Sequence, residues 1–222
     1  MRMPRRDFLR AAAAMSVSPA LAPPLAASET QPNTDSTPVR WAGYDDAIVI
    51  DFLGSPGYFN YPENPPLDAA MIENARTSGI TAMNVTVNGG DFESTIRRMS
   101  PWLSNVDRYP ETFRQVRTVE QLMDAKATGR VGIVLGFQDT TPFGTDLSTM
   151  DVFYEMGVRV VQLTYNVRNM VGDGCLEPGN AGLSSFGIEV VERLNELGMM
   201  VDLSHCGKRT TSEGIRASSA PP

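Results

Sequence analysis

The chain has 222 residues, of which 41% are hydrophobic, and its formal net charge is −7. Residues 1–27 hold four Arg and one Asp, so the rest of the chain carries a charge of −10. This negative balance argues against nucleic acid or an anionic membrane surface as a partner. The length is sufficient for one domain with a hydrophobic core.

Residues 1–27 are typical of a twin-arginine signal peptide. Arg5 and Arg6 precede an alanine-rich apolar run over residues 11–22, and small residues close the segment near Ala26. This run is too short for a permanent membrane-spanning helix, and no other segment of the sequence predicts one. We therefore expect export by the twin-arginine pathway to the periplasm or another extracytoplasmic compartment. The alternative is a basic tail without a signal function.

A linker is predicted between this signal and the globular part. Residues 28–40 are rich in Ser, Thr, Pro and Asn, a composition typical of flexible connections. The predicted globular domain therefore covers residues 41–222.

The globular part repeats one sequence pattern, in which a helical segment ends at a glycine and an apolar segment follows. A glycine at the end of a helix closes it in the left-handed conformation. The glycines are Gly79, Gly129, Gly157 and Gly198. The apolar segments that follow them predict strands over 80–87, 131–137, 158–164 and 199–204, and an opening strand is predicted over 47–53.

Alternating helices and strands with right-handed connections predict a parallel sheet. Because the strand segments are apolar and rich in β-branched residues, we expect them to be buried on both faces. An open doubly wound sheet is the alternative to a barrel. No glycine-rich phosphate-binding motif follows any predicted strand, so a nucleotide site is unsupported.

Three segments carry a family resemblance: GVRVVQLTYN at 157–166, GLSSFG at 182–187 and LGMMVDLSH at 197–205. In these segments the chain resembles the membrane (renal) dipeptidases, a family of binuclear-zinc peptidases. The resemblance implies a (β/α)8 TIM-type barrel of the metal-dependent hydrolase kind, with about the first five βα units in this chain. The sequence then reads as a C-terminally truncated member, or as a short form that completes its sheet as a homodimer.

The resemblance places metal ligands at the ends of the first and third predicted strands. The family has a His-x-Asp pair after the first strand, where this chain has Leu53 and Ser55, and a bridging glutamate after the third, where it has Gln138. Leucine has no donor atom, and serine is a poor zinc ligand. A neutral amide also lacks the charge and the second oxygen that let a carboxylate bridge two cations.

His205 ends the fifth predicted strand, where the family has a metal-binding histidine, and it is the one histidine of the chain. Asp139 and Asp202 are the remaining candidate ligands, but strand alternation should send Asp202 to the face opposite His205. Zinc is thus implied by the resemblance, while the residues argue against a zinc pair held by this chain alone. A strand-end histidine without metal is the alternative for His205.

Tyr165 follows the fourth predicted strand, where the family has a histidine that contacts the substrate. Its hydroxyl can donate a hydrogen bond to a carbonyl or an oxyanion. The resemblance therefore implies catalytic positions at Tyr165 and Gln138, and substrate-binding positions at Asn166 and Arg168. An ordinary polar loop is the alternative.

The cysteines, Cys175 and Cys206, should lie just past neighbouring strands on one face of the barrel. Export to an oxidising compartment would permit a disulfide between them, and two free thiols are the alternative.

These observations lead to three hypotheses about function. The first is an exported metallohydrolase of the membrane dipeptidase type, which hydrolyses small dipeptide-like substrates. The second is a metal-free barrel in which Leu53, Ser55, Gln138 and Tyr165 form a neutral pocket for a small polar ligand. The third is an inactive fragment.

Overall fold

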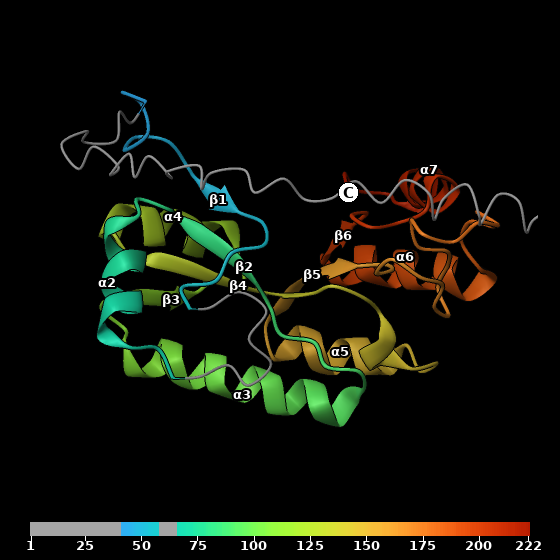
Figure 1. Cartoon of the computed structure of the whole chain (residues 1–222), viewed down its shortest axis with the longest axis horizontal. Helices are drawn as coiled ribbons and strands as arrows, with labels where there is room; N and C mark the ends of the chain where they lie inside the picture. The colour runs from blue at the N-terminus through green and yellow to red at the C-terminus, as the bar shows by residue number, and fades with distance from the viewer. Residues whose placement is uncertain (1–40, 58–65) are drawn as a thin grey trace, which may run out of the picture. The chain divides into compact units, whose positions relative to one another are not determined.

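A curled parallel sheet organises residues 42–222 of the computed structural model (Figure 1). The structure describes residues 41–57 and 66–222, so the predicted signal peptide and linker lie outside the described residues. The strands are β1 (Ile50–Asp51), β2 (Ala82–Thr86), β3 (Phe113–Gln115), β4 (Val131–Phe137), β5 (Val158–Gln162) and β6 (Met200–Asp202). The sheet order is β1-β2-β4-β5-β6, with every pair parallel.

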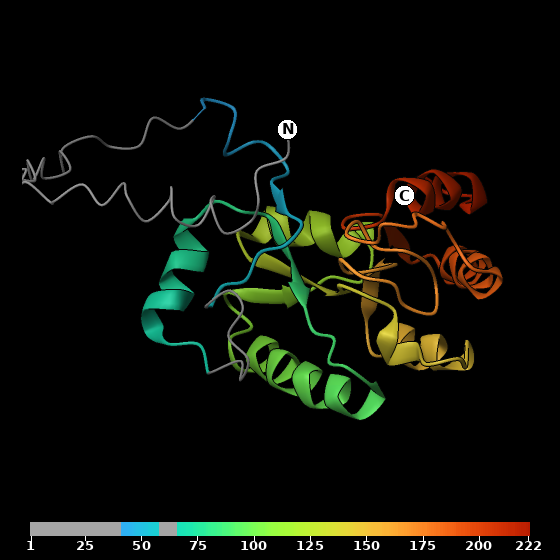
Figure 2. The same cartoon turned by 45° about the vertical axis from the view of Figure 1, so that its right-hand side comes forward.

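Helices wrap around the outside of this sheet (Figures 1 and 2). They are α2 (Ala69–Thr77), α3 (Phe92–Arg108), α4 (Val119–Thr128), α5 (Ser148–Glu155), α6 (Ser185–Leu197) and α7 (Lys208–Ala217), with a short 3-10 helix, η1 (Thr141–Phe143). The arrangement is half of a β/α barrel, as the sequence predicted. No described helix combines the length and apolarity that crossing a membrane would require.

The predicted helix–glycine–strand pattern is confirmed at each of its four glycines, which all have a positive φ. The φ angles are 76° at Gly79, 67° at Gly129, 103° at Gly157 and 71° at Gly198. The starts of two helices are also fixed locally, because Thr118 and Ser184 accept hydrogen bonds from the third residue of α4 and α6. Short-range signals therefore set where these elements begin and end.

Helix α3 and strand β3 are among the elements that were not predicted. Helix α3 begins at a reciprocal cap between Asp91 and Ser94, but Pro101 lies in its interior and interrupts the sequence signal. Strand β3 has three residues and pairs with the first half of β4, while β5 pairs with the second half. Because β2 occupies the other edge of β4, β3 and β5 share one edge in succession.

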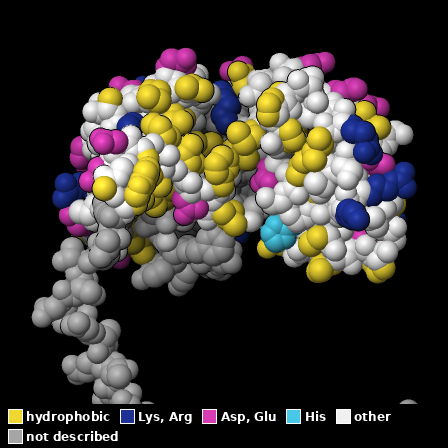
Figure 3. All heavy atoms as spheres, turned by 90° about the horizontal axis from the view of Figure 1, so that it is seen from above, with side chains coloured by type: hydrophobic (Ala, Val, Ile, Leu, Met, Phe, Trp, Pro, Cys, Tyr) yellow, Lys and Arg dark blue, Asp and Glu magenta, His cyan; other side chains and the backbone are white. Residues whose placement is uncertain are grey.

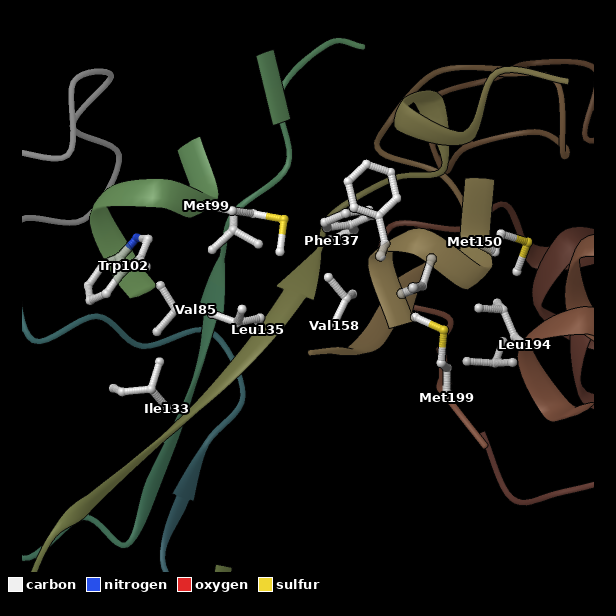
Figure 4. Close-up of a cluster of buried hydrophobic side chains, with 14 of the residues drawn as sticks. Val85, Met99, Trp102, Ile133, Leu135, Phe137, Met150, Val158, Leu194 and Met199 are labelled. Carbon is white, nitrogen blue, oxygen red and sulfur yellow. The ribbon is translucent and has the colours of Figure 1, made fainter. Parts of the chain in front are cut away.

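Strand alternation divides the sheet into two faces. One face packs against the helices in a single hydrophobic core, shown in Figure 4. Its side chains include Val85 of β2, Ile133, Leu135 and Phe137 of β4, Met99 and Trp102 of α3, Met150 of α5 and Leu194 of α6. The alternate side chains of the strands point to the concave face of the curled sheet.

The expectation of strands buried on both faces is correct for β2, β4 and β5 and wrong for the edge strands. Ile50 of β1 is 36% exposed and Met200 of β6 is 43% exposed. Each lies at an edge of the sheet, where neighbours are fewer. Figure 3 shows hydrophobic side chains gathered on the side of the unit where β1 lies.

Candidate active site

A pocket of about 570 Å³ opens at the carboxyl ends of the strands. Its polar lining consists of Asn84 and Thr86 of β2, Gln138 after β4, Gln162 of β5, and Asp202, Ser204 and His205 at the end of β6. Among the described residues that line it, Asp202 has the one carboxylate side chain, and none is Lys or Arg. In β/α barrels the chemistry sits at this end of the strands, which makes the pocket the candidate active site.

Two buried amides form the inner wall of the pocket. Asn84 is 6% exposed and Gln162 is 2% exposed. Asn84 donates from Nδ2 to the Phe52 carbonyl at 2.9 Å, and Gln162 donates from Nε2 to the Thr164 carbonyl at 2.7 Å. A Cβ at position 136 would come within 2.1 Å of the Asn84 Oδ1, so Gly136 makes room for this amide. The wall is polar but uncharged.

Asp202 and His205 line the same pocket, so their expected separation onto opposite faces is wrong. Strand β6 ends at Asp202, and alternation ends with it. Asp202 Oδ1 then accepts a hydrogen bond from the Ser204 backbone at 2.7 Å, and His205 adopts a left-handed φ of 58°. After this turn, both residues border one pocket.

The His205 ring is held by the loop that follows β5. Its Nδ1 lies 2.9 Å from Asn166 Oδ1, and its ring stacks on Tyr165 with centroids 4.4 Å apart. The His205 carbonyl also accepts a hydrogen bond from the Cys175 backbone at 2.8 Å. Tyr165 and Asn166 thus contact His205, although neither lines the pocket.

Arg168 does not line the pocket. Its guanidinium pairs with Asp173, with Nε 2.5 Å from Oδ1, and the Asp173 side chain is 2% exposed. Asp173 also accepts from the Ala181 backbone at 2.5 Å, and its own carbonyl accepts from Thr210. The Arg168 guanidinium, followed by the Ala181 N–H, holds the pKa of Asp173 below its usual range. Arg168 therefore organises the loop between β5 and α6.

Of the remaining predicted positions, some line the pocket and others do not. Leu53 and Gln138 line the pocket, and Gln138 is fixed by its backbone N–H, which donates to Asn88 Oδ1 at 2.8 Å. Ser55 accepts from the Gly57 backbone, and Asp139 accepts from the Thr141 backbone. Both side chains therefore serve local turns.

This donor set does not fit a pair of zinc ions. Within the described residues, no group of three or more His, Cys, Asp or Glu side chains could hold a metal ion. Leu53 presents hydrocarbon to the pocket, and Gln138 presents a neutral amide. A zinc site normally needs three or four protein ligands, which the described residues do not supply.

Both cysteines are free thiols in this structure. They are neighbours, since Gly174 and Cys206 form an isolated antiparallel bridge. Cys175 is exposed, whereas Cys206 is buried and accepts a hydrogen bond from Thr164. Burial raises the pKa of the Cys206 thiol, despite the opposing effect of that hydrogen bond.

Sequence reasoning missed Asn84 and Gln162. A signal was present, because each is an amide inside a mainly apolar strand segment. Strand alternation places both on the concave side of the sheet. Burying an amide there costs free energy unless the amide meets polar partners.

The comparisons with known proteins identify a family. The model described as "Membrane dipeptidase (Peptidase family M19)" matches residues 70–222. Dipeptidase verJ of Clonostachys rogersoniana is 30% identical over 145 residues, which cover 63% of this chain and 37% of that protein. An uncharacterised dipeptidase of Schizosaccharomyces pombe is 36% identical over 143 residues, which cover 59% of this chain and 34% of that protein.

Solved structures share the fold of this chain. An amidohydrolase from Pseudomonas aeruginosa is 33% identical with a TM-score of 0.71, over 80% of this chain and 52% of that one. The probable dipeptidase PvdM of the same organism has a TM-score of 0.67 over the same shares and, at 21% identity, shows the shared fold alone. The chain therefore spans about a third of these curated relatives and about half of these solved chains.

Proposed function

Since the chain belongs to the membrane dipeptidase family, we propose that it is a dipeptidase-like hydrolase whose strand-end pocket takes molecules of dipeptide size. The observation that carries this proposal is the meeting of Leu53, Gln138 and His205 in one pocket, at the three strand ends that the resemblance singled out. The pocket volume of about 570 Å³ lies within the range of small-molecule sites.

The lining can bind a peptide-like molecule through hydrogen bonds. Gln138 offers an amide N–H to a substrate carbonyl, and Asp202 offers a carboxylate to a substrate ammonium or amide N–H. His205 lines the pocket and stacks on Tyr165. The imidazole can accept a proton, and the phenol beside it can donate a hydrogen bond. These groups account for binding and proton transfer by the chain itself.

Zinc enters this proposal by family resemblance alone. Relatives with the same fold include a protein described as a metallo peptidase. Because the donor set here does not fit a zinc pair, no step of the proposed function passes through one.

A second candidate function follows from the same lining. Leu53 and Gln138 leave the pocket neutral except for Asp202, and a neutral, hydrogen-bonding pocket suits a small polar ligand that is bound without hydrolysis. This reading is the metal-free alternative that the sequence raised.

Export is also proposed. The Arg5 and Arg6 pair with its alanine-rich sequel supports secretion by the twin-arginine pathway to an extracytoplasmic compartment. Detection of the processed chain in a periplasmic extract would support export. Retention of the unprocessed chain in the cytoplasm when Arg5 and Arg6 are changed to lysine would support the twin-arginine route.

A homodimer is proposed as well. The edge strands β1 and β6 each pair on one side within the described residues, and exposed strand edges favour association. Light scattering on the purified chain would give twice the monomer mass if the proposal is right.

The function is tested by incubating the chain with a panel of dipeptides, with and without added zinc, and measuring released amino acids and heats of binding. Ser204 is an exposed residue of the pocket lining, so Ser204→Trp should fill the pocket. Ser185→Trp adds the same bulk at the exposed start of α6. We expect turnover that Ser204→Trp abolishes and Ser185→Trp preserves. Binding without turnover would favour the second function, and neither binding nor turnover would overturn both.

A further inference from the structure

The ring of His205 makes one hydrogen bond among the described residues, and its partner is an amide oxygen. Nδ1 lies 2.9 Å from Asn166 Oδ1. A carbonyl oxygen can only accept, so Nδ1 must carry the hydrogen in this contact. In the neutral imidazole the other nitrogen, Nε2, then carries the lone pair.

A second contact supports the orientation of the Asn166 amide. The Cys175 thiol lies 3.6 Å from the same oxygen, and a thiol is a weak donor. Two donors therefore converge on Oδ1.

The backbone that carries this contact is constrained on both sides. Asn166 has a φ of 61° and His205 a φ of 58°, in the left-handed region where side chains other than glycine are uncommon. Two consecutive backbone N–H groups bind the carbonyls of these two residues. The Cys175 N–H donates to the His205 carbonyl and the Leu176 N–H donates to the Asn166 carbonyl, each at 2.8 Å. Such backbone conformations persist where surrounding contacts determine them.

Tyr165 completes the arrangement by covering one face of the imidazole. The two rings are stacked at 4.4 Å with an angle of 28° between their planes. The stack limits tilting of the ring, but it does not select between Nδ1–H and Nε2–H. The choice of tautomer therefore falls to Asn166.

We propose that Asn166 is a positioning residue that holds neutral His205 in the Nδ1–H tautomer and so presents the Nε2 lone pair at the pocket. Asn166 then acts through His205, in place of the direct substrate contact that the resemblance implied. The use of that lone pair to accept a proton from water or substrate rests on the proposed function. The tautomer itself does not.

The single histidine of the chain allows a direct test without resonance assignment. Long-range ¹H–¹⁵N spectra of the free protein, recorded at alkaline pH where imidazole is neutral, distinguish the two tautomers. We expect the wild-type ring to be Nδ1–H. An Nε2–H ring in the wild type would overturn the proposal, whatever the dipeptide assay shows.

Three variants separate positioning from a merely structural role. Asn166→Gly removes the acceptor and adopts positive φ without strain, so we expect a mixture of tautomers in a folded protein. Asn166→Asp keeps an acceptor oxygen and should keep Nδ1–H. Asn180→Gly is the matched control, because Asn180 also has a positive φ, 44°, but accepts from the Arg209 backbone.

An unchanged tautomer in Asn166→Gly would overturn the proposal, since the ring would then be fixed by stacking and packing. A tautomer change in Asn180→Gly would also overturn it, because the effect would reflect general loosening of the loops. A wild-type protein that has the Nδ1–H ring but hydrolyses no dipeptide would count against the proposed function alone.

Discussion

Single residues at the strand ends set what the pocket can bind. Leu53 and Gln138 both line it, and neither offers an anionic oxygen or a free nitrogen lone pair to a cation. At these two positions the lining is therefore neutral, and Gln138 can hold a ligand through hydrogen bonds.

Restoring one carboxylate should therefore not restore zinc chemistry. We expect Gln138→Glu to hydrolyse dipeptides in the presence of zinc no faster than the wild type, because Leu53 still supplies no ligand. Released amino acids and bound zinc are measured together. Zinc-dependent turnover raised tenfold or more by this one change would show that the other ligands are already present.

The pair between Arg168 and Asp173 should make stability depend on pH. A carboxyl group whose pKa is lowered by folding stabilises the protein above its unfolded pKa, about 3.9, and this contribution is lost as the pH falls through the folded-state pKa. We expect Arg168→Met to lower the Tm by several degrees at pH 7, with the difference from wild type shrinking below about pH 4.

The control for this prediction is Arg76→Met, which removes an exposed pair with Glu73 in which both side chains are more than half exposed. Such surface pairs contribute little, so its Tm should stay close to that of the wild type. An Arg168→Met difference that is the same at pH 3 and pH 7 would show that the loss comes from packing.

The two thiols should differ in reactivity. A thiol with a raised pKa forms less thiolate at neutral pH, and burial limits access, so Cys206 should react slowly. We expect a disulfide reagent to label one thiol quickly in the native protein and both thiols in denaturant. Cys175→Ser should remove the fast phase. No free thiol in unreduced protein would instead show that the cysteines pair.

At the scale of elements, glycine positions close the helices. Gly129 ends α4 with a φ of 67°, and a Cβ there would meet no atom within 4 Å. The cost of Gly129→Ala is therefore conformational, and we expect it to lower the free energy of unfolding by about 1–2 kcal/mol. Urea denaturation measures the change.

Gly90 provides the matched control. A Cβ at this position also meets no atom within 4 Å, but its backbone is outside the left-handed region. Gly90→Ala should change the free energy of unfolding by no more than about 0.5 kcal/mol. Equal losses for the two variants would mean that the left-handed closure of α4 is not the cause.

At the scale of the whole molecule, one core joins the strands to the helices. Phe153 of α5 is fully buried and lies 4.9 Å from Phe137 of β4 and 6.0 Å from Phe143 of η1, measured between ring centroids. Because elements distant in sequence share this core, we expect residues 42–222 to unfold in a single transition.

Phe153→Ala should lower the free energy of unfolding by about 3–5 kcal/mol without splitting that transition. Met123→Ala, on an exposed side chain of α4, should change it by no more than about 0.5 kcal/mol. Two separate transitions in the Phe153 variant, followed by circular dichroism and tryptophan fluorescence, would show that the halves of the sheet fold independently.

The sequence by itself determined the parallel sheet and the order of five of its strands and of the helices that end at a glycine. These follow from signals within a few residues, such as a left-handed glycine at 79, 129, 157 or 198 followed by an apolar segment. The family resemblance added the curvature of the sheet and the strand ends at which Leu53, Gln138 and His205 would meet.

Only the tertiary structure decided which side chains share the pocket. Asp202 and His205 line the same pocket because the strand ends and the chain turns between them. Arg168 pairs with the buried Asp173 and does not line the pocket. Asn166, in a different loop, contacts the His205 ring. Asn84 and Gln162 become a polar wall only when the sheet curls. Each of these contacts joins residues from different elements or depends on where a strand stops, and local sequence patterns do not specify either one.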